Sequence, residues 1–322
     1  RGLRAITDHA HARGLKTILW FEPERVTPGT WLYDTHPEWL LGEDGGQKLL
    51  DLGNPDAWRW LVDHTDALLT SQGIDLYRQD FNMDPLTYWR NADAPDRQGI
   101  TEIRHVTGYL AFWDELLRRR PGLRIDTCAS GGRRNDLETL RRAVPLWRSD
   151  YILEPTGTQG CTYGISSWIP FHGTGVKEAD PYRFRSMMTP YPNCLWDARR
   201  TDLDYGEFRR LTAQWEMVAP DYAGDFYPLT PYSLEDTVWM AWQFDCPERG
   251  EGMVQAFRRE NSGEESLRVT LHGVEADTFY TLTNLDTADV TEITGRELLE
   301  QGIELVLPDK PKSAVIVYRK KR

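Results

Sequence analysis

The chain has 322 residues, which predicts roughly two domains at the usual size of about 150 residues each. Its 38 basic and 50 acidic residues give a net charge of −12. That balance disfavours nucleic acid and anionic membranes as partners, because phosphate binding needs clustered Lys and Arg. No run of about 18 apolar residues occurs, so no membrane span is expected.

The first segment, RGLRAITDHAHARGLK, is typical of a helix that is already under way, without a capping residue in front of it. The chain also begins without Met and without a signal pattern. We therefore expect a fragment of a longer protein. His9 and His11 lie on opposite faces of this helix and no HExxH motif occurs, so metal binding is not expected. No other cofactor is expected either.

The first two-thirds of the chain alternate helix-like and strand-like segments. An apolar strand is predicted at 16–21. A helix is predicted over 55–71, because its apolar residues recur at helical spacing, Asn54 caps it and Pro55 occupies its first position. Further helices are predicted at 107–120, 135–142 and 205–217, and strand-like segments at 73–77, 123–128, 145–150, 166–171 and 186–191.

Repeated β-then-α spacing predicts an α/β fold with a parallel sheet. Polar residues stand where the apolar runs end: Glu22, Asp80, Cys128 and Asp150. The carboxyl ends of the strands carry the chemistry of a (β/α)8 TIM barrel. About six of the eight strands are present, so we expect a catalytic barrel over residues 1–233 that is incomplete at the N-terminus.

Short apolar segments separated by Asp and Gly follow residue 234. Strands are predicted at 238–244, 253–257, 266–271, 278–282, 302–307 and 313–318. This pattern favours a C-terminal antiparallel β-sandwich domain over residues 234–322. The chain holds four scattered cysteines, Cys128, Cys161, Cys194 and Cys246, without metal spacing. Reduced thiols are expected, and the compartment stays open with the cytoplasm favoured.

The stretch LYRQDFNMDP places Arg78, Asp80 and Asn82 at alternate positions, which share one face of a strand. Such a trio is costly to bury unless each group is paired. Asp80 and Asp150 together are the two carboxylates that glycosidic cleavage requires, one to attack the anomeric carbon and one to protonate the leaving oxygen. Each alone is more often a helix cap. Arg78 could hold Asp80 ionised.

Three neighbouring features leave alternatives open. The segment Cys128–Arg133 contains two glycines that let backbone approach a ligand, but it also fits a plain turn, and a cysteine nucleophile would lack a marked His partner. Trp20 could lie against a sugar ring. Glu22 or Glu24 could supply a third carboxylate, or pair only with Arg25 or neighbouring helices.

Six motifs occur in a shared order: LWFEPE at 19–24, HPEW at 36–39, LDLGNP at 50–55, RQDFN at 78–82, CASGG at 128–132 and WRSD at 147–150. In that order they resemble glycoside hydrolase family 36, the α-galactosidases of the melibiase type, over about residues 1–230. The resemblance implies a retaining hydrolase that removes terminal α-D-galactosyl residues from oligosaccharides. It also implies a barrel followed by a β-domain.

The resemblance further implies that Asp80 is the nucleophile and Asp150 the acid/base. The galactose subsite would be lined by Trp20, Arg78, Asn82, Cys128 and Gly131. Two departures concern substrate contacts, since the family usually has Lys where Arg78 stands and Arg where Gly45 stands.

These departures leave alternatives open: an α-N-acetylgalactosaminidase, a transglycosylase of the raffinose-synthase kind, or a sugar-binding barrel without catalysis. The expected partner is a small-molecule or oligosaccharide substrate, and a homo-oligomer is possible.

Overall fold

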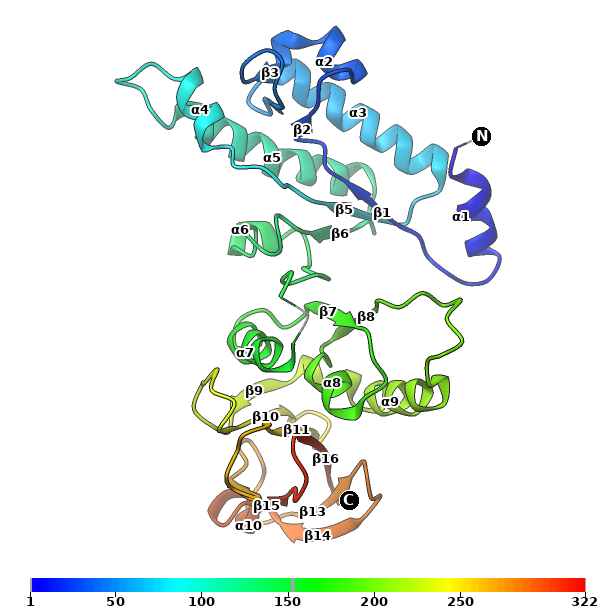
Figure 1. The fold of residues 1–322 in the computed structure, drawn as a ribbon, viewed down its shortest axis with the longest axis vertical. Coiled ribbons are helices and arrows are strands. Elements are labelled where there is room, and N and C mark those ends of the chain that lie inside the picture. Colours follow the sequence, from blue (N-terminus) through cyan, green and yellow to red (C-terminus); the bar gives the residue numbers. More distant parts are fainter. Residues whose placement is uncertain (1, 152–153, 322) are drawn as a thin grey trace. The chain divides into compact units, whose positions relative to one another are not determined.

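The computed structural model describes residues 2–151 and 154–321 and has an α/β fold (Figure 1). Two compact units make up the chain, Arg1–Asp150 and Tyr151–Arg322, and each is described by itself. Among the described residues, no helix combines the length and apolar character that a membrane crossing requires. Within the same residues, no group of three or more His, Cys, Asp and Glu is placed to hold a metal ion.

The first unit is built on a parallel sheet of three strands, in the order β1-β5-β6. These strands are β1 (Ile18–Phe21), β5 (Leu76–Gln79) and β6 (Arg124–Thr127). The parallel pairing expected from the alternation of elements is therefore confirmed. The register places Trp20 beside Arg78 and Arg78 beside Asp126, so one residue from each strand stands in a single row across the sheet.

Helices pack on this sheet and shorter elements connect it. The longer helices are α1 (Arg4–His11), α3 (Pro55–Gln72) and α5 (Ile100–Arg119). The shorter elements are β2 (Arg25–Val26), α2 (Trp31–Thr35), the 3-10 helix η1 (Pro37–Trp39), β3 (Leu40–Leu41), β4 (Lys48–Leu50), α4 (Leu86–Ala92) and α6 (Leu137–Leu140). Residues 145–150 do not form the expected strand, and an isolated parallel bridge joins Asp126 to Val144 just before them.

Helix α3 begins and ends where its sequence signals predict. The Asn54 side chain accepts hydrogen bonds from the backbone N–H groups of Asp56 and Ala57, which the helix itself leaves unpaired. Gly73 ends the helix in the left-handed conformation at φ 67°, which a residue without Cβ adopts freely. The strand β5 follows at once, so these local signals set the entry of the strand that leads to Asp80.

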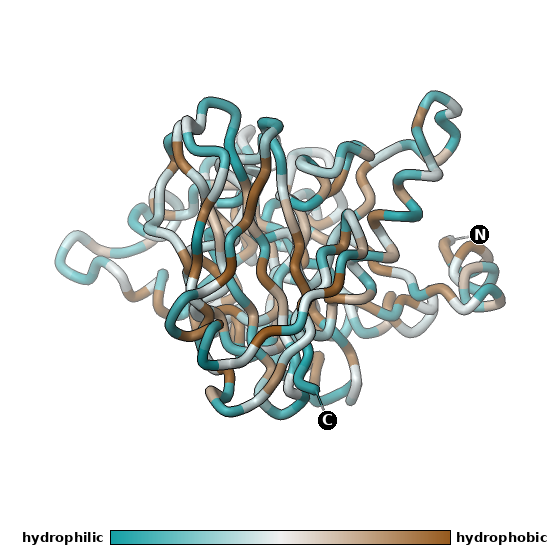
Figure 2. The backbone as a smooth tube through the Cα atoms, turned by 90° about the horizontal axis from the view of Figure 1, so that it is seen from below, coloured by the Kyte–Doolittle hydropathy of each residue, from teal (hydrophilic) through white to brown (hydrophobic). Residues whose placement is uncertain are grey.

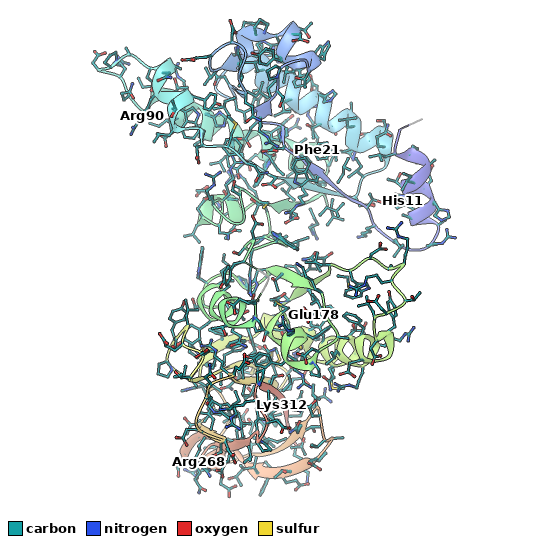
Figure 3. All side chains as sticks on the ribbon, viewed as in Figure 1. His11, Phe21, Arg90, Glu178, Arg268 and Lys312 are labelled. Carbon is teal, nitrogen blue, oxygen red and sulfur yellow. The ribbon has the colours of Figure 1, made fainter. Side chains whose placement is uncertain are left out.

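The core of the first unit lies between the sheet and α3 and α5. Tyr77 and Ile125 from the sheet are buried against residues of the two helices, among them Leu61, Phe112 and Trp113. Figure 3 labels Phe21 on β1 and His11 on α1. His11 Nε2 lies 2.8 Å from a carboxylate oxygen of Asp75, so this histidine ties α1 to the start of β5.

The second unit contains a parallel pair of strands, β7-β8, and a six-stranded antiparallel sheet in the order β14-β13-β16-β11-β10-β9, with a two-stranded sheet β12-β15. Its elements are α7 (Pro155–Ile165), β7 (Gly173–Val176), α8 (Pro181–Ser186), β8 (Tyr191–Cys194), α9 (Tyr205–Val218), the 3-10 helix η2 (Ala219–Ala223), β9 (Asp225–Pro228), β10 (Trp239–Cys246), β11 (Glu251–Arg258), β12 (Ser266–Val269), β13 (Phe279–Asn284), β14 (Val290–Thr294), α10 (Gly295–Glu300), β15 (Ile303–Val306) and β16 (Lys312–Lys320).

Two strand predictions in this unit are wrong. The segment 166–171 follows the end of α7 in a turn, and the strand begins only at Gly173. The segment 186–191 covers the end of α8, with the strand beginning at Tyr191. Asp180 caps α8 and Pro181 occupies its first turn, a start signal that outweighs the apolar run after it.

The central strands of the six-stranded sheet are apolar on both faces. Met240 and Trp242 belong to one buried cluster, whereas Trp239 and Ala241 belong to another on the opposite face. Figure 2 shows hydrophobic stretches along the extended segments and many hydrophilic residues at the outer loops. Burial on both faces explains why these strands are continuous apolar runs. The expected domain boundary between residues 233 and 234 stays a prediction.

Candidate active site

Asp80 directly follows β5, and groups from each of the three strand ends surround its carboxylate. The indole Nε1–H of Trp20 donates to Oδ2 at 3.1 Å. The backbone N–H of Phe81 donates to Oδ1 at 2.8 Å, and that of Ser130 reaches the same oxygen at 3.4 Å. The carboxylate is therefore fixed in orientation at the end of the central strand of the sheet.

These hydrogen bonds decide the protonation of Asp80. Burial by itself would raise its pKa, but hydrogen bonds from Asn82, Trp20, the Phe81 N–H and the Cys128 thiol outweigh burial and hold the pKa below its usual value. Asp80 is consequently a carboxylate at neutral pH, the form that a nucleophile requires.

Arg78 forms its ion pair with a carboxylate other than Asp80. Its guanidinium donates to Asp126, its cross-strand neighbour on β6. The other oxygen of Asp126 accepts from the N–H of Leu146 at 2.9 Å. The positive charge of Arg78 therefore acts on Asp80 from a distance. The guanidinium group of Arg78 is oriented by the buried carboxylate of Asp126.

The loop after β6 contacts both candidate carboxylates. Ser130, Gly131 and Gly132 all have positive φ angles of 46°, 74° and 121°, which turn the backbone sharply. A Cβ added to Gly131 would lie 2.7 Å from Cγ of Asp150. Ser130 contacts Asp80, and Gly131, the next residue, lies against Asp150. The two carboxylates therefore lie on either side of the same short backbone turn.

Asp150 is exposed, and its Oδ1 accepts a hydrogen bond from the Trp147 indole at 2.9 Å. Asn82 is also exposed, and its backbone N–H donates to Glu22 at 2.6 Å. Trp20 is 49% exposed, so a large part of its indole is open to solvent. An exposed ring beside a fixed carboxylate is suited to stacking on a sugar face.

The structure weighs against a cysteine nucleophile at this site. Cys128 is buried, and burial raises the pKa of its thiol to about 11. The thiol therefore stays protonated at neutral pH and can donate a hydrogen bond to Asp80, whereas a nucleophilic cysteine needs a lowered pKa.

Neither glutamate of the first motif is left free to act as a third acid. Glu22 pairs with Arg25 and accepts from Asn82. Glu24 is fully buried and bound by the guanidinium of Arg134, which holds its pKa at about 2 against the effect of burial. Their contacts favour the structural alternative for both residues.

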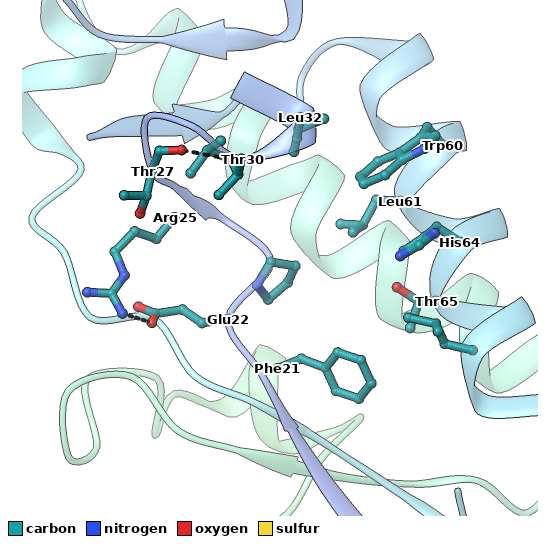
Figure 4. A pocket seen from close by; sticks show the side chains of 13 residues that line it. Phe21, Glu22, Arg25, Thr27, Thr30, Leu32, Trp60, Leu61, His64 and Thr65 are labelled. Atoms are coloured by element: carbon teal, nitrogen blue, oxygen red, sulfur yellow. Dashed lines mark hydrogen bonds and ion pairs between the residues drawn. The ribbon is translucent and has the colours of Figure 1, made fainter. Parts of the chain in front are cut away.

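A cavity of about 310 Å³ opens beside Glu22, between the segment after β1 and helix α3 (Figure 4). Phe21, Trp60, His64 and Thr65 line it together with the Glu22–Arg25 pair. Its wall is mainly apolar and belongs to the helix side of the sheet. The predicted site residues Trp20, Asp80 and Asp150 are not among the residues that line it.

Two contributors to the site lie outside the predicted set. Asp126 orients Arg78, and the Ser130 N–H contacts Asp80. A carboxylate inside the short strand Arg124–Thr127 was a usable signal, because a charge buried in a strand must be paired. The Ser130 contact had no such signal, since a backbone N–H is present at nearly every residue.

The match to a known protein family covers residues 1–176, with a family described as melibiase. The chain belongs to the melibiase family. It is 29% identical to an α-galactosidase of Escherichia coli over 362 aligned positions, which cover 98% of this chain and 49% of that protein. It is 26% identical to α-galactosidase 1 of Pediococcus pentosaceus, over 84% of this chain and 39% of that protein. The chain thus spans less than half the length of these curated relatives.

Solved structures show the same fold. A variant of the GH36 α-galactosidase AgaA from Geobacillus stearothermophilus, solved with stachyose, matches 99% of this chain and 47% of its own, with a TM-score of 0.86 and 23% identity. The α-galactosidase of Lactobacillus brevis matches all of this chain and 46% of its own, with a TM-score of 0.85 and 19% identity.

Proposed function

We propose that this chain carries the catalytic carboxylates of a retaining α-galactosidase that removes terminal α-D-galactosyl residues from oligosaccharides. The observation that carries the proposal is the contact of consecutive residues, Ser130 and Gly131, with Asp80 and Asp150 respectively. Retaining cleavage needs two carboxyl groups about 5–5.5 Å apart on either side of one bond. One turn of backbone between them suits that requirement.

In the first step, the Asp80 carboxylate attacks the anomeric carbon while Asp150 gives its proton to the leaving glycosidic oxygen. A covalent β-galactosyl ester on Asp80 results, and the aglycone leaves as an alcohol. In the second step, ionised Asp150 takes a proton from water, whose oxygen attacks the anomeric carbon and releases Asp80. Two inversions return the α configuration.

The galactose subsite in this proposal is lined by Trp20, Arg78, Asn82, Cys128 and Gly131. The exposed indole of Trp20 would cover one sugar face, and the fork of Arg78, oriented by Asp126, would donate to hydroxyls. AgaA structures with stachyose and with raffinose suggest galactosylated sucrose derivatives as substrates for this chain as well.

The finer fold assignment belongs to the same proposal. We assign residues 1–233 to a (β/α)8 barrel that this chain contains in part, and residues 234–322 to a β-sandwich. The parallel strands β1, β5 and β6 and the parallel pair β7-β8 support the barrel. The six-stranded antiparallel sheet with the two-stranded sheet supports the second domain.

The proposal is tested by hydrolysis of an aryl α-D-galactoside, by the protein expressed with its complete natural reading frame, followed by ¹H NMR. We expect α-galactose as the first product, before mutarotation. First formation of β-galactose would contradict the double displacement. Turnover of the aryl α-N-acetylgalactosaminide alone would favour an α-N-acetylgalactosaminidase. Transfer of galactose to sucrose in place of water would favour a transglycosylase. No turnover of any of these substrates would favour a sugar-binding barrel.

Gly131→Ala is expected to lower kcat/KM for the aryl galactoside by about 10²-fold or more, because a 1 Å misplacement of a reacting group can cost that much. The added Cβ would overlap the Asp150 carboxylate, and φ 74° is strained for alanine. Gly164→Ala is the matched control, since its Cβ would meet nothing within 4 Å. Wild-type kinetics in Gly131→Ala would show that the close contact with Asp150 is not needed.

A further inference from the structure

Two backbone donors to Asp80 are held in place by the residues that follow Gly131 and Gly132 in the chain. Phe81 and Ser130 supply the two backbone N–H groups at Oδ1. Arg133 fastens both of these residues, because its Nη2 lies 2.8 Å from the Ser130 hydroxyl and 3.4 Å from the Phe81 carbonyl. The Ser130 hydroxyl also donates to the Phe81 carbonyl at 3.2 Å.

Arg134, the next residue, lies over the side chain of Phe81. Its guanidinium carbon is 4.6 Å from the Phe81 ring centroid and 3.9 Å from that of Tyr109. A guanidinium between two aromatic faces is attracted to both and cannot turn freely. Arg134 therefore fixes the side chain of Phe81, and the backbone N–H of the same residue orients the carboxylate of Asp80.

Glu24 anchors Arg134 from a different strand end. The two form a bidentate pair with N–O distances of 2.8 and 2.6 Å, and Glu24 is fully buried. Glu24 also contacts His105 Nε2 at 2.9 Å and accepts from Gln79 Nε2 at 2.8 Å. Gln79 is the last residue of β5, directly before Asp80, so one carboxylate ties together the ends of β1 and β5 and the loop after β6.

We propose that Glu24 and Arg134 are positioning residues for the candidate nucleophile. Their buried pair holds the Phe81 side chain directly and the turn at Ser130 through the adjacent Arg133, so that both N–H groups stay on Asp80. The inference rests on the proposed galactosidase function. Stability alone does not explain the pair, because a buried ion pair is often no more stabilising than apolar residues of similar size.

The double variant E24Q/R134M tests the proposal, because it removes both charges of the pair together, so that neither is left buried without the other. The amide introduced at position 24 keeps a polar partner for Gln79 and His105, and the thioether introduced at position 134 keeps an unbranched stem beside Phe81. We expect kcat to fall by about 10- to 100-fold with KM within a few-fold of wild type. R185M/D286N is the matched control, because Arg185 and Asp286 form a similar bidentate pair inside the second unit and this variant also removes both charges together.

The pH profile separates positioning from general destabilisation. Asp80 attacks only when ionised, so turnover falls as the pH drops through its pKa. Loss of the Phe81 and Ser130 donors raises that pKa and moves the acid limb of kcat/KM to higher pH. The other charged or titratable groups near Asp80 are Arg78, paired with Asp126, then Cys128, and Asp150 on the far side of the turn at Gly131. E24Q/R134M leaves all of them in place.

A wild-type kcat and an unmoved acid limb in E24Q/R134M would overturn the proposal, as would equal changes in R185M/D286N. If the unmutated protein hydrolyses no α-galactoside, the proposed function fails, and crystal structures of wild type and E24Q/R134M then decide on positioning. A lost or lengthened contact between Phe81 N and Asp80 Oδ1 supports it. An unchanged contact refutes it. If E24Q/R134M does not fold, the single variant E24D, which keeps the charge but shortens the reach, takes its place in each comparison.

Discussion

Replacing Asp80 with Asn is expected to lower kcat on an aryl α-D-galactoside by about 10⁴-fold or more, the scale seen when a nucleophile is removed from an enzyme. The amide nitrogen and oxygen of Asn cannot form a stable glycosyl ester. The fold should persist, because the Phe81 and Ser130 N–H groups can still donate to an amide oxygen in the place of Oδ1, and only the hydrogen bond from Trp20 to Oδ2 is lost. Steady-state kinetics with a circular dichroism melting curve measures both quantities.

Rescue of activity by azide distinguishes a variant that has lost only its nucleophile from one that has lost its fold. In Asp80→Gly the space left by the carboxylate admits azide, which attacks the anomeric carbon in its place. The product is β-galactosyl azide, inverted relative to the α-substrate, and turnover recovers in part. Asp114→Asn is the control carboxylate in the same unit, since Asp114 is exposed and pairs with Arg142, far along the chain from Asp80, and it should keep full activity. An active Asp80→Asn would end the assignment of Asp80.

Replacing Asp150 with Ala is expected to have the second largest effect, and the loss should depend on the leaving group. Raffinose needs a proton on its departing oxygen, so kcat/KM should fall by about 10²–10⁴-fold, the usual contribution of general acid catalysis. A dinitrophenyl galactoside, whose phenolate leaves unprotonated, should lose much less in its first step. Its second step slows because water lacks a base, and the glycosyl-enzyme then accumulates as a kinetic burst.

Azide also distinguishes Asp150 from Asp80. In Asp150→Ala the azide anion needs no base, so it attacks the β-glycosyl ester on Asp80 and gives α-galactosyl azide. The opposite configurations from the two variants assign the two roles independently of each other. Equal losses on raffinose and on the dinitrophenyl galactoside would exclude Asp150 as the acid.

Much of the fold follows from local signals. The Asn54 cap and Gly73 predict α3, and alternating apolar runs predict the strands of the six-stranded sheet, because capping and side-chain period act over a few residues. Helix α7 is the opposite case. Its sequence PTGTQGCTYGI contains three glycines, which disfavour a helix, and its Gly157, Thr158 and Gln159 are buried in the folded unit.

Residue type and spacing were enough to predict the strands β1, β5 and β6, the resemblance to the melibiase family and the choice of Asp80 and Asp150 as candidate carboxylates, because these signals act over a few residues. Only the tertiary structure decided the partners. Arg78 pairs with Asp126 instead of Asp80, and Glu24 pairs with Arg134, 110 residues away. A buried charge pairs with whichever opposite charge the packed strands bring within reach, and that distance is not set until the sheet has formed.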